Sequence, residues 1–158
     1  MIQPSIDRLT YLCDTIPTLL RNIPDSEFTH KPGPSKWSKQ EIMGHLIDSA
    51  TNNHQRFVRI QFENEPRIAY DQDNWNLYSY YNQLGKEHVI SFWEKYNRHL
   101  IEVAKRIPAH NLQLTSIYSD NSTVTLGWLI QDYVVHLEYH LCQVVDYGAG
   151  KITYPQPK

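Results

Sequence analysis

The chain has 158 residues, 41% of them hydrophobic and 20% charged, and 15 Lys and Arg nearly balance 17 Asp and Glu to give a net charge of -2. This length is typical of one domain, so we expect a single domain over residues 1–158. The near-neutral charge argues against a nucleic-acid footprint, which needs a basic face. No run approaches the roughly 18 consecutive apolar residues of a membrane span, and no secretory signal opens the chain.

The two cysteines, Cys13 and Cys142, lie far apart and outside any C-x-x-C spacing. This pattern indicates neither a disulfide framework nor a zinc knuckle, and a reducing compartment fits it best. We therefore expect a cytoplasmic protein that binds neither nucleic acid nor a membrane. The sequence leaves open whether it is a monomer or a homodimer.

The first predicted helix carries apolar residues at intervals of three and four residues from Ile6 to Leu20. Pro17 lies inside this pattern and is expected to kink or split the helix, because proline lacks a backbone donor and crowds the carbonyl four residues back.

A second helix is expected to begin at Ser38, because Ser38 and Glu41 have the spacing of a capping box. It is expected to end before Pro66. From Glu63 to Asn82 the helical pattern gives way to aromatic and polar residues, which favours an ordered covering loop. We expect Tyr70, Asp71 and Trp75 to hold this loop across the bundle.

A third helix is predicted over residues 89–107, where Pro108 ends it, and a loop with weak alternation follows over residues 112–118. A fourth helix is expected to begin after Thr125 as N-cap and to run to Gly148, a natural C-terminal stop. Four helices with little strand signal predict an all-α fold, a four-helix bundle.

The fourth helix carries the main chemical signal, because His136 and His140 are four residues apart and therefore point the same way one turn apart. Two such imidazoles can share a metal ion, although two histidines that face solvent or bond backbone carbonyls would give the same spacing. Glu138 follows His136 by two positions and projects away, so this is not the H-E-x-x-H motif of zinc proteases. Asp132 and Gln143 fall on the histidine face and could orient the imidazoles.

A third ligand must come from another helix, and six histidines remain: His30, His45, His54, His88, His99 and His110. His45 borders the apolar stripe of the second helix and shares a face with Asp48. His54 follows it by nine residues and so lies on the opposite side, which means that the two cannot bind the same ion. Residue spacing makes His45 plausible without selecting it.

Three segments together resemble the DinB/YfiT-like superfamily: KWSKQEIMGHL over residues 36–46, YDQDNW over residues 70–75 and DYVVHLEYHLCQ over residues 132–143. The resemblance extends over roughly residues 5 to 148. It implies a four-helix bundle of up-down-down-up order with a long connection between the second and third helices. It also implies one divalent ion held by His45, His136 and His140, with Ni or Zn as the first choice and Fe or Mn as the alternatives.

The resemblance further implies a metal-dependent enzyme, either a thiol S-transferase that joins a low-molecular-weight thiol to a small electrophile or a hydrolase. A divalent ion on three neutral imidazoles keeps its full charge and would acidify water or a thiol. Asp132, Gln143 and Asp48 are the candidates for further catalytic roles. A non-catalytic metal-binding protein of the stress response is the alternative from a different class.

Overall fold

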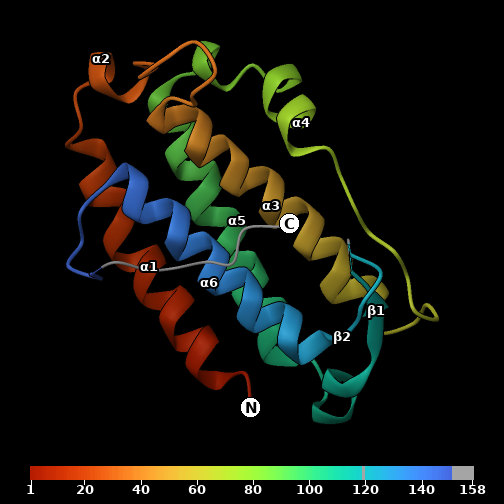
Figure 1. Cartoon of the computed structure of the whole chain (residues 1–158). Coiled ribbons are helices and arrows are strands. Elements are labelled where there is room, and N and C mark those ends of the chain that lie inside the picture. Colours follow the sequence, from red (N-terminus) through yellow and green to blue (C-terminus); the bar gives the residue numbers. More distant parts are fainter. Residues whose placement is uncertain (119, 151–158) are drawn as a thin grey trace.

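Four long helices form the protein, whose computed structural model describes residues 1–118 and 120–150 (Figure 1). They are α1 (Gln3–Arg21), α3 (Lys39–Arg59), α5 (Lys86–Arg106) and α6 (Leu126–Val144). Helices α1 and α3 each pack against both α5 and α6. Figure 1 shows α1 and α6 running in one direction and α3 and α5 in the other. The fold is therefore the expected up-down-down-up four-helix bundle; residue 119 and residues 151–158 of the predicted domain lie outside the described residues.

Side-chain caps fix the starts of the two helices that matter most for the site. The Ser38 Oγ accepts the Glu41 N–H at 3.0 Å, and the Glu41 Oε2 accepts the Ser38 N–H at 2.7 Å. This capping box confirms the predicted start of α3. The Thr125 Oγ1 accepts the Trp128 N–H at 3.2 Å and so caps α6 as predicted.

Two helix predictions need correction. Helix α1 runs through Pro17 without a break, so the expected split is wrong; the proline is buried among the core side chains of this helix. Helix α6 ends at Val144 rather than at Gly148, because Val145 already has extended backbone angles. Gly148 does have a positive φ, 74°, which is the conformation expected of a glycine that ends a helix.

The connection from α3 to α5 has to return along the bundle because these two helices are parallel (Figure 1). It is ordered, as predicted, but it contains two short helices, α4 (Gln72–Tyr78) and the 3₁₀ helix η1 (Tyr81–Gln83). Gln40 donates from Nε2 to the Leu84 carbonyl at 2.8 Å, and Asn76 donates from Nδ2 to the Glu41 carbonyl at 2.7 Å. These bonds hold the segment against the first turn of α3.

The remaining elements are short: α2 (Asp25–Phe28), η2 (Ala109–Gln113), and the strands β1 (Thr115–Ile117) and β2 (Thr123–Thr125). The strands form an antiparallel hairpin in which Thr115 faces Thr125. The sequence pattern predicted only weak alternation here, because strands of three residues carry little periodicity. The hairpin leads directly into α6 and so sets where that helix begins.

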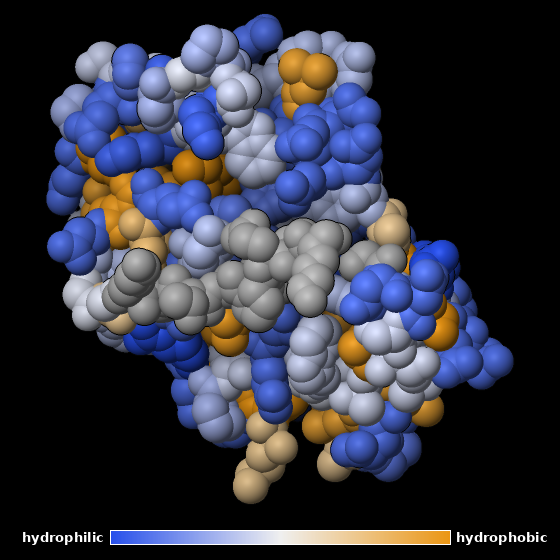
Figure 2. Space-filling model, in the orientation of Figure 1, coloured by the Kyte–Doolittle hydropathy of each residue, from blue (hydrophilic) through white to orange (hydrophobic). Residues whose placement is uncertain are grey.

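The core contains large buried side chains from every long helix, with Trp93, Phe57 and Tyr133 among the largest. Helix α3 differs from its neighbours, because a set of its polar side chains is also buried: Gln40, His45, Asp48, Ser49, Asn52 and Asn53. On the side of the molecule shown in Figure 2, most of the surface is hydrophilic and the apolar residues form separate groups. Within the described part of the chain, no helix is long and apolar enough to cross a membrane.

Candidate metal centre

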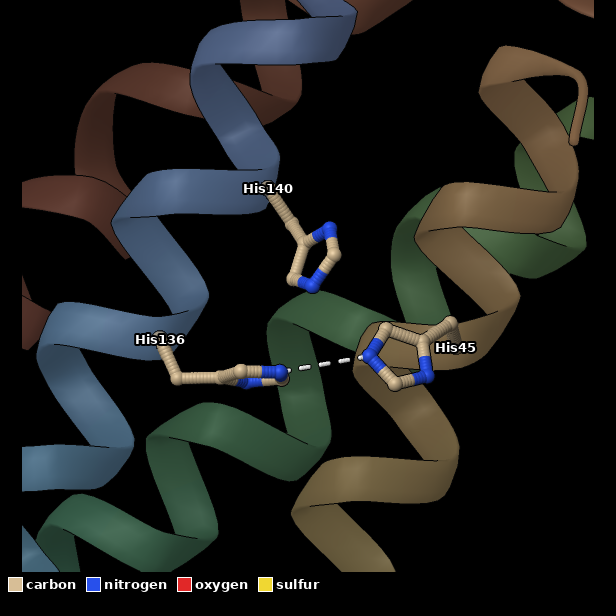
Figure 3. A group of neighbouring side chains, drawn as sticks. All are labelled: His45, His136 and His140. Atoms are coloured by element: carbon tan, nitrogen blue, oxygen red, sulfur yellow. Dashed lines mark hydrogen bonds between the residues drawn. The ribbon is translucent and has the colours of Figure 1, made fainter. Parts of the chain in front are cut away.

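Three histidines meet between α3 and α6. Figure 3 shows His45 on α3 facing His136 and His140 on α6, with a ring nitrogen of each directed into the space between them. One ring nitrogen from each lies within 4.8 Å of the others. The Nε2 atoms of His45 and His136 are 3.3 Å apart, and the ring centroids are separated by 4.7 to 5.2 Å. The structure thus brings together the three residues that were predicted as ligands.

Burial keeps these imidazoles neutral. His45 is 1% exposed, and its burial, together with the nearby His140, lowers its pKa from 6.5 to about 3. Burial lowers the pKa of His140 to about 4, against an opposite effect of the neighbouring Gln143. Burial, reinforced by the two other histidines, lowers the pKa of His136 well below 6.5. Neutral imidazole is the form that binds metal, so the site is ready for an ion at neutral pH.

The donor set fits a transition-metal ion. Three converging nitrogen lone pairs cannot all be satisfied by hydrogen bonds among the three rings, whereas one cation can accept all of them. Among the described residues, no cysteine or acidic group joins the cluster. An all-imidazole set suits Zn, Ni or Fe better than Mg or Ca, which prefer oxygen. Three protein ligands would leave a coordination position open, as catalytic sites require.

Glu138 lies away from the histidines, as helical geometry predicted. Its Oε1 accepts from the Arg8 Nε at 2.9 Å and from the Tyr147 hydroxyl at 3.2 Å. The carboxylate therefore ties α6 to α1 and is not placed as the general base of a zinc protease.

The three polar residues predicted to assist the site occupy different environments. Gln143 lines a groove beside His140. Asp132 accepts the Tyr118 hydroxyl at 3.3 Å. Asp48 is buried under Tyr81, whose hydroxyl donates to its Oδ1 at 2.6 Å, and burial raises the pKa of Asp48 to about 6 despite that bond. Of the three, only Gln143 is among the residues that line the groove.

The groove has a volume of about 520 Å³, and none of the three histidines is among its lining residues. It is lined by residues of the α2–α3 loop, of α3, of α4 and of α6: Pro32, Ser35, Lys36, Trp37, Ile42, Gln72, Asp73 and Gln143. Trp37 joins groove and site, because its ring centroid lies 5.0 Å from that of His45. Trp37 belongs to the motif of residues 36–46, but no role was predicted for it, since a loop side chain has no periodicity to place it.

Tyr81 was also missed. A Cβ on Gly44 would lie 2.1 Å from the Tyr81 ring, so this glycine is what lets the ring approach α3 and reach Asp48. A glycine in the middle of an otherwise good helix, next to the candidate ligand His45, was the available signal.

The chain is similar in sequence to two curated proteins. Among curated proteins, the chain is 21% identical over 126 residues to a protein of Oceanobacillus iheyensis and 24% identical over 145 residues to one of Halalkalibacterium halodurans. The first match covers 79% of this chain and 72% of the relative, and the second covers 90% and 84%. Both relatives carry the provisional name of metal-dependent hydrolase.

Two solved structures share the fold. YfiT from Bacillus subtilis, described as a probable metal-dependent hydrolase with an unusual four-helix bundle topology, matches with a TM-score of 0.81 at 17% identity, over 90% of this chain and 82% of its own. A mutant of a mycothiol-dependent maleylpyruvate isomerase matches with a TM-score of 0.79 at 10% identity, over 97% of this chain and 65% of its own. The family model of the DinB superfamily matches residues 9–144, and the chain therefore belongs to the DinB superfamily.

Proposed function

We propose that this protein is a metal-dependent thiol S-transferase that joins a low-molecular-weight thiol to a small electrophile. The observation that carries the proposal is the convergence of three neutral imidazoles, to which a groove of about 520 Å³ is linked by its lining residues Trp37 and Gln143. The histidines hold the ion, for which Ni or Zn is our first choice. When bound there, the ion supplies Lewis-acid activation of the nucleophile. The groove offers space for a second, organic reactant.

A thiol suits this site better than water does. The ordinary pKa of a thiol is near 8.5 and that of water near 15.7, so a thiol needs a much smaller pKa shift to become a nucleophile at neutral pH. Among the described residues, no carboxylate lies within the histidine cluster to assist water as a general base. The similarity to a mycothiol-dependent isomerase points to the same kind of co-substrate.

The thiol has to come from outside the chain. Cys13 is buried and burial raises its pKa to about 12, so its sulfur stays protonated. Cys142 contacts the Tyr147 hydroxyl at 3.5 Å and does not line the groove. Both cysteines are free, which fits the reducing, cytoplasmic compartment in which such thiols are kept.

The polar residues near the site receive separate roles in this proposal. Gln143 lines the groove next to His140, where its amide can bond a polar group of the substrate. Asp132 and Asp48 lie one helical turn from His136 and His45, and we assign them to positioning the two ligand-bearing helices. We assign Trp37, whose ring centroid lies 5.0 Å from that of His45, to shielding one side of this imidazole from water.

Hydrolysis is the second candidate, favoured by the names of both curated relatives. An activity assay distinguishes thiol transfer from hydrolysis. Metal-loaded protein is incubated with monochlorobimane and a panel of thiols, and ester and amide substrates are tested in parallel. We expect turnover that requires both thiol and metal, that is lost in His45→Ala, and that is retained in Cys142→Ser and in Glu138→Gln.

Other outcomes reject the proposal. Turnover with water alone identifies a hydrolase. Loss of turnover in Cys142→Ser with metal still bound makes a protein thiol the nucleophile. No turnover across both panels, with metal bound, leaves a non-catalytic metal-binding protein. Elemental analysis of protein purified without added metal identifies the ion.

A further inference from the structure

A second pair of histidines lies on the opposite side of α3 from the metal centre. His54 follows His45 by nine residues, or about half a turn around the helix axis. Its ring meets that of His99 on α5, with centroids 5.0 Å apart and an angle of 76° between the ring planes. His54 is half-buried and His99 is exposed. The pair thus spans the two parallel helices at the surface.

The geometry of this pair repeats that of the metal centre. There, the three histidine pairs have centroid separations of 4.7 to 5.2 Å and interplanar angles of 71°. The separation of His54 and His99 falls within that range, and their angle differs from 71° by about five degrees. Rings at this separation can share one ion, at bond lengths of about 2.0 to 2.1 Å, once a nitrogen of each ring is turned toward it.

Tyr96 holds His54 in a way that suits a ligand. Its hydroxyl lies 3.2 Å from the His54 Nδ1, and its ring stacks on Phe92 with centroids 5.6 Å apart. When Nδ1 carries the proton, it donates to the Tyr96 oxygen and leaves the Nε2 lone pair for a metal. Metal-bound histidines commonly have such a partner on the other ring nitrogen, which fixes tautomer and ring orientation.

The surroundings allow a cation to approach. Burial, followed by the proximity of His99, lowers the pKa of His54, so this imidazole is neutral at neutral pH. The nearby Arg59 is paired with Glu63 at 2.7 Å, which balances its charge. A hollow of about 220 Å³ adjoins His54, lined by Gln55, Val58 and Arg59 as well, and gives room for coordinating water.

We propose that His54 and His99 form a second metal site, in which a divalent transition-metal ion joins α3 to α5 and water completes its coordination. Among the described residues, no third histidine, cysteine or acidic ligand completes this pair. With two protein ligands rather than three, the site binds more weakly than the metal centre. Imidazole ligands select Cu²⁺ first and then Zn²⁺ or Ni²⁺. This proposal is independent of the enzymatic one, because it does not involve the groove.

The test is equilibrium dialysis of the folded chain, already carrying its tightly bound ion, against increasing Zn²⁺ at neutral pH. We expect a second, weaker class of site in the wild type. His99→Ala should abolish that class while the tightly bound ion stays, and because His99 is exposed this variant should fold normally. Tyr96→Phe should weaken it by about tenfold through loss of the Nδ1 partner. His88→Ala, which removes an exposed histidine of the same helix, is the matched control.

A second readout follows from the bridge between helices. Excess Zn²⁺ should raise the melting temperature of the wild type and of His88→Ala, but not that of His99→Ala, because the ion binds the folded pair only. Circular dichroism establishes that each variant is folded. The proposal is overturned if the weaker class is missing in the wild type, if it persists in His99→Ala, or if His88→Ala also loses it.

Discussion

The contact between Gly44 and Tyr81 leaves no room for a larger side chain at residue 44. Gly44→Ala would place a Cβ 2.1 Å from the Tyr81 ring and force that ring, with its bond to Asp48, to move. We expect a loss of about 1 to 3 kcal/mol in the free energy of unfolding, as for other overpacked sites. Urea denaturation measures it.

Two controls separate this clash from a general effect of alanine. At Gly33, an added Cβ would meet only a Lys36 side-chain carbon at the ordinary contact distance of 3.6 Å, so Gly33→Ala should change stability little. In a Tyr81→Ala background the clash is gone, and Gly44→Ala should then cost much less than in the wild type. Equal costs in both backgrounds would contradict the contact.

Glu138 provides a second test at a single residue. Glu138→Gln weakens the tie to Arg8 on α1 but removes nothing from the histidine cluster. We expect unchanged metal content and a lower free energy of unfolding, measured by elemental analysis and urea denaturation. Arg8→Gln should destabilise in the same direction. Loss of metal in Glu138→Gln would mean that this carboxylate belongs to the site after all.

At the scale of one element, the start of α3 combines two functions in Ser38. Its Oγ caps the helix through the Glu41 N–H and also donates to the Asn82 Oδ1 at 2.6 Å, which joins the end of the covering segment to the cap. Ser38→Ala should cost about 1 kcal/mol for the cap, plus the loss of the bond to Asn82.

A change at residue 82 separates the two functions. Asn82→Ala removes the acceptor of the Ser38 hydroxyl but keeps the cap, so its stability should lie between those of the wild type and Ser38→Ala. Thr125→Ala removes only a cap, that of α6, and should cost about 1 kcal/mol in the same urea denaturation. If Asn82→Ala destabilised the protein as much as Ser38→Ala does, the cap would contribute nothing.

Much of the element structure was predictable because it depends on neighbours in sequence. Apolar spacing located the four long helices, the capping box placed the start of α3, and four-residue spacing brought His136 and His140 together. The short helix α4 and the β1–β2 hairpin were not predicted, since elements of a few residues have too little periodicity to detect. The break expected at Pro17 did not occur, because tertiary packing overrides local preference.

The site itself was predictable only in part. Spacing alone left His45 one of six candidates, and the family resemblance selected it. The approach of Trp37 to His45 and of Tyr81 to Asp48 could not be predicted, because both depend on the path of connecting segments. Such contacts join residues on different elements, and no pattern within one segment specifies them.

For the whole molecule, three buried neutral histidines predict acid sensitivity of the metal-free protein. Their folded pKa values lie below the ordinary 6.5, at about 3 for His45 and about 4 for His140. The unfolded chain therefore binds protons at these histidines that the folded chain does not bind. The free energy of unfolding falls as the pH drops from about 6.5 towards 4. Each such histidine contributes about 1.4 kcal/mol per pH unit. Urea denaturation of chelator-treated protein at several pH values measures this slope.

Asp48 acts in the opposite direction, because its folded pKa of about 6 exceeds the ordinary 3.8. Between pH 6 and pH 3.8 the folded chain binds a proton at Asp48 that the unfolded chain does not bind. This group therefore stabilises the folded chain as the pH falls, and it offsets the destabilising effect of one histidine. We expect Asp48→Asn to steepen the acid loss of stability and His140→Ala to make it shallower. A metal-free protein equally stable at pH 7 and pH 4 would contradict the buried neutral site.

The placement of the three candidate ligands on α3 and α6 would also have a mechanical consequence. His45 and His136 are 91 residues apart, so an ion shared by them closes most of the chain into a ring. A chain pulled by its ends would extend only outside that ring until coordination breaks, and would then release about 300 Å of further length. Single-molecule pulling should show this extra extension as a separate step when the metal is bound, and the step should be absent when a chelator has removed the metal. The same few bonds that prepare a reaction would thus set how far the chain can be drawn out under force.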